Sequence, residues 1–218
     1  MHPNVGARLG TVRVRSGAAD IWFAWVDQHA DVVATLSRDV LSDAERSRLG
    51  RYRNLASAGC YVITRALVRR VLGEHLAIPP NQVTVRVTDL GKPVVSDDLH
   101  FNVSHSGDLI VMAVSAERAV GVDVERRRPV VRADALIARW LTPVEQQEVR
   151  RLTADGVNVS DAFLRVWSTK ESGLKAIGVG ISGATTADLT NVVAVALDDL
   201  LTKATRDADR YVGSVAFA

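Results

Sequence analysis

Cysteine is almost absent from this chain. Cys60 is the single cysteine among 218 residues, so no disulfide can form within the chain. It lies in an apolar stretch, where a cysteine is more often a small core residue than a nucleophile. The fold must therefore depend on a hydrophobic core, which a chain of this length can bury. A reduced, cytoplasmic location is the expectation.

Long apolar runs and a strong excess of one charge are also missing. No stretch approaches the roughly 20 residues needed to span a membrane. No basic region followed by an apolar run opens the sequence, so no signal peptide is expected. The 27 basic and 25 acidic residues give a net charge of +2. We therefore expect neither a membrane nor a nucleic acid as the partner of this protein.

Local patterns predict a mixture of helices and strands. Two Ser/Thr–Glu pairs, Ser42 with Glu45 and Thr142 with Glu145, have the spacing of a capping box at a helix start. Helices are expected at about 41–53, 56–76, 133–140, 143–152 and 161–177. Strands are expected at about 21–26, 83–87, 100–103, 109–115, 120–125, 192–197 and 211–217. The fold class is therefore α+β.

The order of these elements repeats in outline along the chain. A long helix, a strand and a closing apolar strand occur before residue 115 and again after residue 160. This order predicts two similar α+β halves packed together, which we divide into residues 1–108 and 109–218. The cleft between two such halves is a preferred place for a ligand.

Two acids share one face of the expected strand VGVDVE. Side chains alternate along a strand, so Asp123 and Glu125 point the same way. Adjacent carboxylates repel each other unless a cation lies between them. Magnesium prefers oxygen ligands of this kind. A solvated edge strand carrying two acids is the alternative.

A third acid lies on the expected helix 161–177. In WSTKESGLK, Trp167, Glu171 and Lys175 are four residues apart and share one helix face. Packing of Trp167 into the core would direct Glu171 and Lys175 to one spot. The alternative is an exposed Glu–Lys pair, which contributes only about 0.2–0.5 kcal/mol.

Two short segments carry groups suited to phosphate. In FNVSHSG, Ser104 and His105 lie where an apolar strand gives way to a glycine turn, and His105 can donate to a phosphate. No G-x-S-x-G surrounds Ser104, which argues against a hydrolase. In Gly91-Lys92-Pro93, a rigid turn holds a lysine that can act as a point charge for phosphate. Ordinary surface turns are the alternative for both segments.

Together, the segments GKP, FNVSHSG, VGVDVE and WSTKESGLKAIGVG occur in an order that resembles the 4′-phosphopantetheinyl transferases. In particular, the chain is similar to the larger, monomeric type that activates nonribosomal peptide and polyketide synthases. The motifs span residues 91–183, and a looser resemblance extends from residue 41 to the C-terminus. The first 20 residues match nothing. The resemblance implies a pseudo-dimer of two α+β halves with coenzyme A in the cleft.

This resemblance also implies an activity of the holo-[acyl-carrier-protein] synthase type. Such enzymes move the phosphopantetheine arm of coenzyme A onto a serine of an apo acyl or peptidyl carrier protein and release adenosine 3′,5′-bisphosphate. Asp123, Glu125 and Glu171 would hold Mg²⁺, or Mn²⁺, together with the pyrophosphate. Glu171, or a water that it holds, would be the base, and Lys175 would stabilise the leaving phosphate. With Asp123 and His105, these two residues form the expected catalytic set.

The remaining assignments concern coenzyme A. Lys175, Ser104 and His105 would contact its phosphates, Gly91 and Lys92 would form a coenzyme-binding turn, and Arg48 would meet the 3′-phosphate. A solvated helix face is the alternative for Arg48. Related sequences often have an arginine where this chain has Ala58-Gly59-Cys60, and Glu145 is expected to cap a helix.

A rival hypothesis is a non-enzymatic module that binds coenzyme A or nucleic acid through the basic stretch Arg46–Arg53. The acidic trio argues against it, because carboxylates repel phosphate unless a metal intervenes.

Overall fold

The computed structural model describes residues 11–181, 184, 186–204 and 207–218. Its strands are β1 (Val12–Ser16), β2 (Ala19–Trp25), β3 (Arg86–Val87), β4 (Pro93–Val94), β5 (His100–Ser106), β6 (Leu109–Ser115), β7 (Val120–Arg126), β8 (Val193–Ala196) and β9 (Tyr211–Phe217). Its helices are α1 (Val33–Asp39), α2 (Asp43–Leu49), α3 (Leu55–Leu76), α4 (Ala133–Trp140), α5 (Pro143–Ala154), α6 (Val159–Ile177) and α7 (Asp198–Ala204). The expected mixture of helix and sheet is confirmed.

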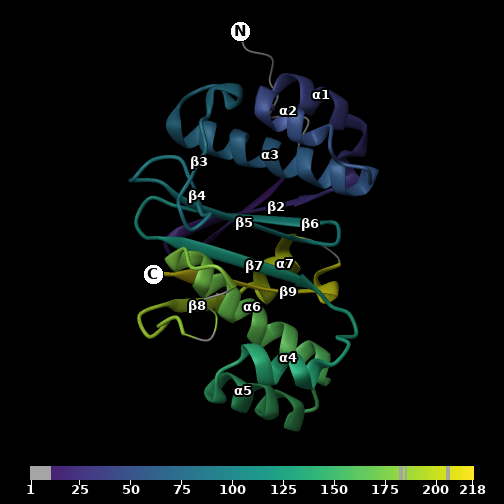
Figure 1. Cartoon of the computed structure of the whole chain (residues 1–218), viewed down its shortest axis with the longest axis vertical. Coiled ribbons are helices and arrows are strands. Elements are labelled where there is room, and N and C mark those ends of the chain that lie inside the picture. The colour runs from purple at the N-terminus through teal and green to yellow at the C-terminus, as the bar shows by residue number, and fades with distance from the viewer. Residues whose placement is uncertain (1–10, 182–183, 185, 205–206) are drawn as a thin grey trace.

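Two sheets lie face to face at the centre of the molecule (Figure 1). The first has the strand order β1-β2-β6-β5, the second has the order β7-β9-β8, and each hydrogen-bonded pair in them is antiparallel. A separate hairpin pairs β3 with β4. Strand β6, which the division at residue 108 assigned to the C-terminal half, pairs within the first sheet. The chain passes from the first sheet to the second between Ser115 and Val120, while residues 1–10 of the expected N-terminal half lie outside the described residues.

Helices cover the outer face of each sheet (Figure 1). Alternate residues of β2 and β6 point to opposite sides, so one set packs against α3 and the other against the second sheet. The core between the sheets therefore contains side chains from β2, β6, β7 and β9. Helix α6 lies on the far side of the second sheet, where α4 and α5 pack against it. No helix in the described ranges is long and apolar enough to cross a membrane.

Both predicted capping boxes are confirmed, and each is tied to a long helix. The Ser42 hydroxyl accepts from the Glu45 amide at the start of α2, and Thr142 does the same for Glu145 at the start of α5. Glu45 also accepts from Arg69 of α3 at 2.7 Å, and Glu145 accepts from Lys170 of α6 at 2.6 Å. Each glutamate thus caps one helix and anchors it to the next.

Some local expectations were incomplete. Helices α1 and α7 and strand β1 were not predicted, whereas the strand expected at 21–26 is confirmed as β2. The turn at Gly17, with φ +55°, joins β1 to β2 in a hairpin. The strand expected at 83–87 shortens to Arg86–Val87. Val83 leaves the strand because its side chain is buried against α3 and its carbonyl accepts from Arg69 at 2.7 Å.

Candidate metal and phosphate site

Gly121 sets the distance between strand β7 and helix α6. A Cβ atom at this position would lie 2.1 Å from the Ser172 carbonyl oxygen and 2.3 Å from the Ala176 nitrogen. Glycine is therefore required for the helix backbone to pass directly over the strand. The residues on that face of α6, Glu171 and Lys175, come to lie beside the next outward-facing residue of the strand, Asp123.

Trp167 fixes the rotation of α6, as its spacing predicted. Its ring stacks on Phe163 at 6.1 Å between centroids and meets Trp140 edge-on at 6.3 Å. This cluster packs the N-terminal part of α6 against α4, so the helix face that continues through Glu171 turns toward β7.

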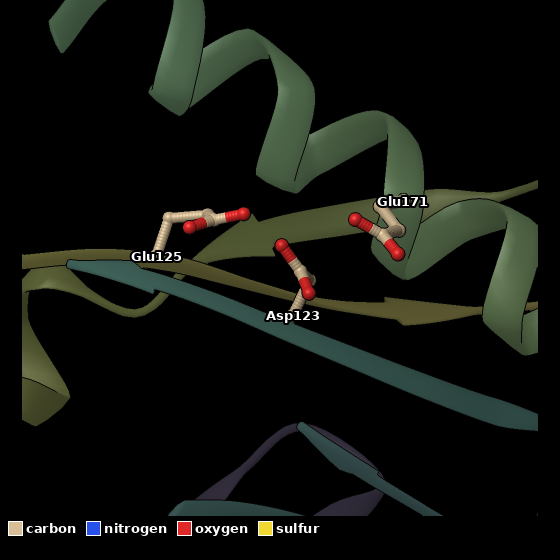
Figure 2. A group of neighbouring side chains, drawn as sticks. All are labelled: Asp123, Glu125 and Glu171. Atoms are coloured by element: carbon tan, nitrogen blue, oxygen red, sulfur yellow. The ribbon is translucent and has the colours of Figure 1, made fainter. Parts of the chain in front are cut away.

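The three predicted metal ligands converge (Figure 2). Asp123, Glu125 and Glu171 each offer a carboxylate oxygen, and these three oxygens lie within 4.8 Å of one another. Asp123 is buried, whereas the other two acids are half-buried. Two acids from a strand and one from the helix above it therefore form a single cluster.

The two carboxylate oxygens of Asp123 differ in their surroundings. Oδ1 accepts from the Ser104 hydroxyl at 2.9 Å and from the Lys175 ammonium at 2.7 Å. Oδ2 is buried and has no hydrogen-bond partner among the described residues. Burial raises the pKa of Asp123 to about 7, although the charge and hydrogen bond of Lys175 act in the opposite direction. An unpaired, desolvated carboxylate oxygen is costly to bury, so it marks a position that favours a cation.

The side chains of the other two acids are partly exposed, at 17% for Glu125 and 18% for Glu171. Oε2 of Glu125 accepts from the Arg128 guanidinium at 2.8 Å and from the Ser106 hydroxyl at 3.3 Å. Oε1 of Glu171 lies 3.8 Å from the Lys175 ammonium. An all-carboxylate donor set with one buried, unpartnered oxygen fits a hard divalent cation such as Mg²⁺, which binds one or two carboxylates and keeps other positions for water or phosphate.

Ser104 and His105 point to opposite sides of β5. Ser104 faces β7 and joins the acidic cluster, whereas His105 lines a pocket of about 440 Å³ on the α3 side. Cys60, Tyr52 and Tyr61 line the same pocket. His105 is exposed, yet neighbouring atoms displace enough of its water to lower its pKa, and the charge of Lys175 lowers it further.

Arg48 lies next to the pocket that contains His105. Its guanidinium stacks on the Tyr61 ring at 5.5 Å, and it lines an adjoining surface pocket together with Arg51, Arg53 and Tyr52. Because Tyr52 and Ser57 line both pockets, the pocket with the arginines adjoins the pocket that contains His105.

Lys92 contacts the C-terminal end of α6. Its ammonium donates to the Ala176 carbonyl at 2.6 Å, and loss of solvent lowers its pKa. Gly91 precedes it with φ +85°, a conformation that favours glycine. The turn that carries both residues is therefore docked on the helix that carries Glu171 and Lys175.

Three residues in or next to the site were not predicted from the sequence. Ser106 and Arg128 donate to Glu125. Asn102 accepts from the backbone amide of Val122 in β7. The alternation of polar Asn102, Ser104 and Ser106 with other residues of β5 was the available signal, since such a pattern places all three on one face. Which element that face meets is decided by tertiary packing.

Two family models match consecutive parts of the chain. The model described as the 4′-phosphopantetheinyl transferase superfamily matches residues 119–210. The model described as the N-terminal part of 4′-phosphopantetheinyl transferases matches residues 24–117. The change between them falls in the connection from β6 to β7, where the chain passes from one sheet to the other.

Several curated proteins are similar in sequence. The 4′-phosphopantetheinyl transferase HetI of Nostoc sp. is 36% identical over 160 residues, which cover 71% of this chain and 65% of the relative. The 4′-phosphopantetheinyl transferase gsp of Aneurinibacillus migulanus is 33% identical over 156 residues, with 72% and 62% covered. The human L-aminoadipate-semialdehyde dehydrogenase-phosphopantetheinyl transferase is 32% identical over 149 residues, with 63% and 48% covered.

The chain therefore spans between about half and two thirds of the length of these curated relatives. Both family models nevertheless describe the same family, and their matches together extend over most of the sequence. The chain belongs to the 4′-phosphopantetheinyl transferase superfamily.

Proposed function

We propose that this protein transfers the 4′-phosphopantetheine arm of coenzyme A to a serine of an apo acyl or peptidyl carrier protein. The observation that carries the proposal is the cluster of three carboxylates in which Asp123 has a buried Oδ2 without a hydrogen-bond partner among the described residues. Membership of the transferase superfamily supports it, since the relatives named above are phosphopantetheinyl transferases. Carrier proteins of nonribosomal peptide and polyketide synthases are the proposed substrates.

Asp123, Glu125 and Glu171 would hold Mg²⁺, with Mn²⁺ as a substitute. The ion would neutralise the negative charge of the coenzyme A pyrophosphate, which the three carboxylates alone would repel. Lys175 lies 2.7 Å from Asp123 and 3.8 Å from Glu171, so its ammonium is placed to contact the same phosphates.

The reaction exchanges one phosphorus–oxygen bond for another. The carrier serine oxygen forms a bond to the β-phosphorus, and the bond from this phosphorus to the bridging oxygen breaks. The serine proton passes to Glu171, directly or through a water. Adenosine 3′,5′-bisphosphate leaves, with Lys175 stabilising the charge on its departing phosphate oxygen.

Coenzyme A would extend from the acidic cluster toward the pockets beside α3. His105 and Ser104 would contact its phosphates, and Arg48 would meet the 3′-phosphate at the nucleotide end. The Gly91–Lys92 turn would bind the coenzyme as well. An ammonium has three N–H donors, so the bond from Lys92 to Ala176 leaves two of them for a phosphate.

We also infer a pseudo-dimeric architecture with the active site in the cleft between two halves of a monomer in the cytoplasm. The matched arrangement of Glu45 with Arg69 and Glu145 with Lys170 supports an internal duplication. Each glutamate caps the start of one helix. Each also accepts a hydrogen bond from a basic side chain about 25 residues further along, on the long helix that follows.

A mass-spectrometric assay tests the proposed transfer. The protein is incubated with coenzyme A, Mg²⁺ and a panel of apo carrier proteins, and the carriers should gain the mass of the phosphopantetheine arm. Asp123→Ala should abolish transfer without unfolding the protein, whereas Glu148→Gln, which changes an exposed acid of α5, should retain it. A chain that modifies no carrier in the panel would contradict the proposal, and metal-independent, salt-sensitive binding of nucleic acid would favour a binding module.

A further inference from the structure

Strands β5 and β7 are neighbouring edge strands of different sheets. Three side chains of β5 reach across to the backbone of β7. Oδ1 of Asn102 accepts from the Val122 amide at 3.0 Å, the Ser104 hydroxyl from the Val124 amide at 3.4 Å, and the Ser106 hydroxyl from the Arg126 amide at 3.0 Å. Side chains thus satisfy amides on the edge of β7 that β9 does not pair.

The spacing of these three bonds defines the alignment of the strands. Each acceptor lies 20 residues before its donor, so β5 and β7 run parallel in a fixed register. The alternate residues of β5 point the other way, as Phe101 and Val103 do into the core under α3. A shift of β7 by one residue would turn its carboxylates to the opposite face.

The two serines also hold the carboxylates of the acidic cluster. Ser104 donates to Oδ1 of Asp123 at 2.9 Å, and Ser106 donates to Oε2 of Glu125 at 3.3 Å. A hydroxyl has one donor and two acceptor positions, so each serine can bind an amide and a carboxylate at once. In both cases, the carboxylate belongs to the residue just before the bonded amide.

We propose that Asn102, Ser104 and Ser106 form a register clamp that positions Asp123 and Glu125 for the metal ion. Asn102 binds only the Val122 amide and so fixes the alignment of β7. The residue before this amide is Gly121, which has no carboxylate. Ser104, together with Lys175, holds Oδ1 of Asp123 and leaves Oδ2 for a metal ion, while Ser106 orients Glu125. Asn102 and Ser106 are positioning residues, since they act through the acids. The inference rests on the proposed function, because that function assigns the metal to these acids.

A matched pair of substitutions isolates the hydroxyl of Ser106. Threonine keeps the hydroxyl, and valine has nearly the same shape without it. Mn²⁺ alone is titrated into the metal-free protein, and free Mn²⁺ is followed by electron paramagnetic resonance. Ser106→Val should weaken Mn²⁺ binding by about 10- to 100-fold, the usual effect of losing a group that orients a metal ligand. Ser106→Thr should remain close to the wild type.

The control is Ser115→Ala, which removes a buried hydroxyl at the far end of the first sheet, where Ser115 accepts from the amides of Glu117 and Arg118. This variant should bind Mn²⁺ normally even where its melting temperature falls. If Ser106→Val does not fold, Asn102→Leu tests the same clamp. It removes the acceptor for the Val122 amide but keeps a side chain of similar size, so Mn²⁺ should bind several-fold less tightly, and binding equal to that of the wild type would overturn the clamp.

The outcomes separate the clamp from the proposed function. If Ser106→Val binds Mn²⁺ as tightly as the wild type, the clamp is overturned and the metal site stands. If the wild type binds no Mn²⁺ and transfers no phosphopantetheine, the proposed function itself fails. In a transfer assay, the clamp predicts that Ser106→Val raises the Mg²⁺ concentration needed for half-maximal rate more than it lowers the rate at saturating Mg²⁺.

Discussion

At the scale of single residues, the electrostatics of Asp123 depend on Lys175. Burial raises the pKa of this carboxyl to about 7, and Lys175 opposes the increase through its charge and its hydrogen bond. The positive charge favours the ionised form, so its removal must favour the protonated form. Lys175 therefore keeps part of the Asp123 population ionised at neutral pH in the metal-free protein.

Replacing Lys175 with methionine should raise the pKa of Asp123 further, by about one unit or more. The carboxyl carbon of Asp123 can be followed by NMR during a pH titration of the metal-free variant. Lys203→Met, which removes an exposed lysine of α7, is the control and should leave the titration unchanged. A pKa of Asp123 that does not change in Lys175→Met would mean that the ion pair is absent in solution.

The three acids of the site were predicted from the sequence, but their burial and their hydrogen-bond partners were not. Strand alternation placed Asp123 and Glu125 together, and the four-residue spacing after Trp167 placed Glu171 and Lys175 on one helix face. The distance between that strand and helix depends on Gly121, whose role is visible only when the two backbones are in contact. The unpartnered Oδ2 of Asp123 is likewise a property of the packed protein.

At the scale of elements, Glu45 connects α2 to α3. The loss of solvent would raise its pKa, but the Ser42 amide and the guanidinium groups of Arg65 and Arg69 lower it overall. Because the folded-state pKa lies below the unfolded value, Glu45 contributes stability above the unfolded pKa. This contribution is lost as the pH falls through the folded pKa.

Glu45→Gln should lower the free energy of unfolding at pH 7 by about 3 kcal/mol, because it leaves two guanidinium groups without their buried partner. Glu74→Gln is the matched control. It removes an exposed acid from a 3.2 Å pair with Arg70 on α3, so the expected loss is below about 0.5 kcal/mol. Urea denaturation at pH 7 measures both losses. Equal losses in the two variants would show that the buried pair has no special role.

The close packing of α6 on β7 implies that a side chain at Gly121 would destabilise the protein. Gly121→Ala would place a methyl group against the backbone of α6, so we expect the free energy of unfolding to fall by about 3 kcal/mol or more. Gly50→Ala is the control, because its nearest contact would be an ordinary 3.6 Å and its φ is −61°. Thermal unfolding by circular dichroism compares them. A folded, wild-type-like Gly121→Ala protein would contradict the packing.

Elements with strong local signals were predictable, and those that depend on partners were not. The capping boxes and the long helices follow from residues close in sequence. Helices α1 and α7 are each seven residues long, too short to be stable alone, so their formation depends on tertiary contacts. Among the described strands, β1 pairs only with β2. Its Val12 and Val14 alternate with arginines as a strand requires, but the strand is five residues long and half-exposed, so the signal is short.

At the scale of the whole molecule, the two sheets share one core. Apolar side chains of β2 and β6 pack directly against those of β7 and β9. The repeat in the sequence predicted two similar halves packed together, but a repeat reveals which elements recur and not which faces of them meet. Removing either sheet would expose a large apolar face of the other, so neither half is expected to be stable without its partner.

This shared core predicts a single cooperative unfolding transition. The four tryptophans report on the two parts separately, since Trp22 and Trp25 lie in β2, whereas Trp140 and Trp167 lie at α4 and α6. Thermal melts of a Trp22→Phe/Trp25→Phe variant should show the same fluorescence and circular dichroism midpoint, and so should melts of a Trp140→Phe/Trp167→Phe variant. Val111→Ala and Val215→Ala, one from each sheet, should each lower the midpoint of the whole chain. Two separated transitions, with one valine variant shifting only one of them, would instead show that the sheets unfold independently.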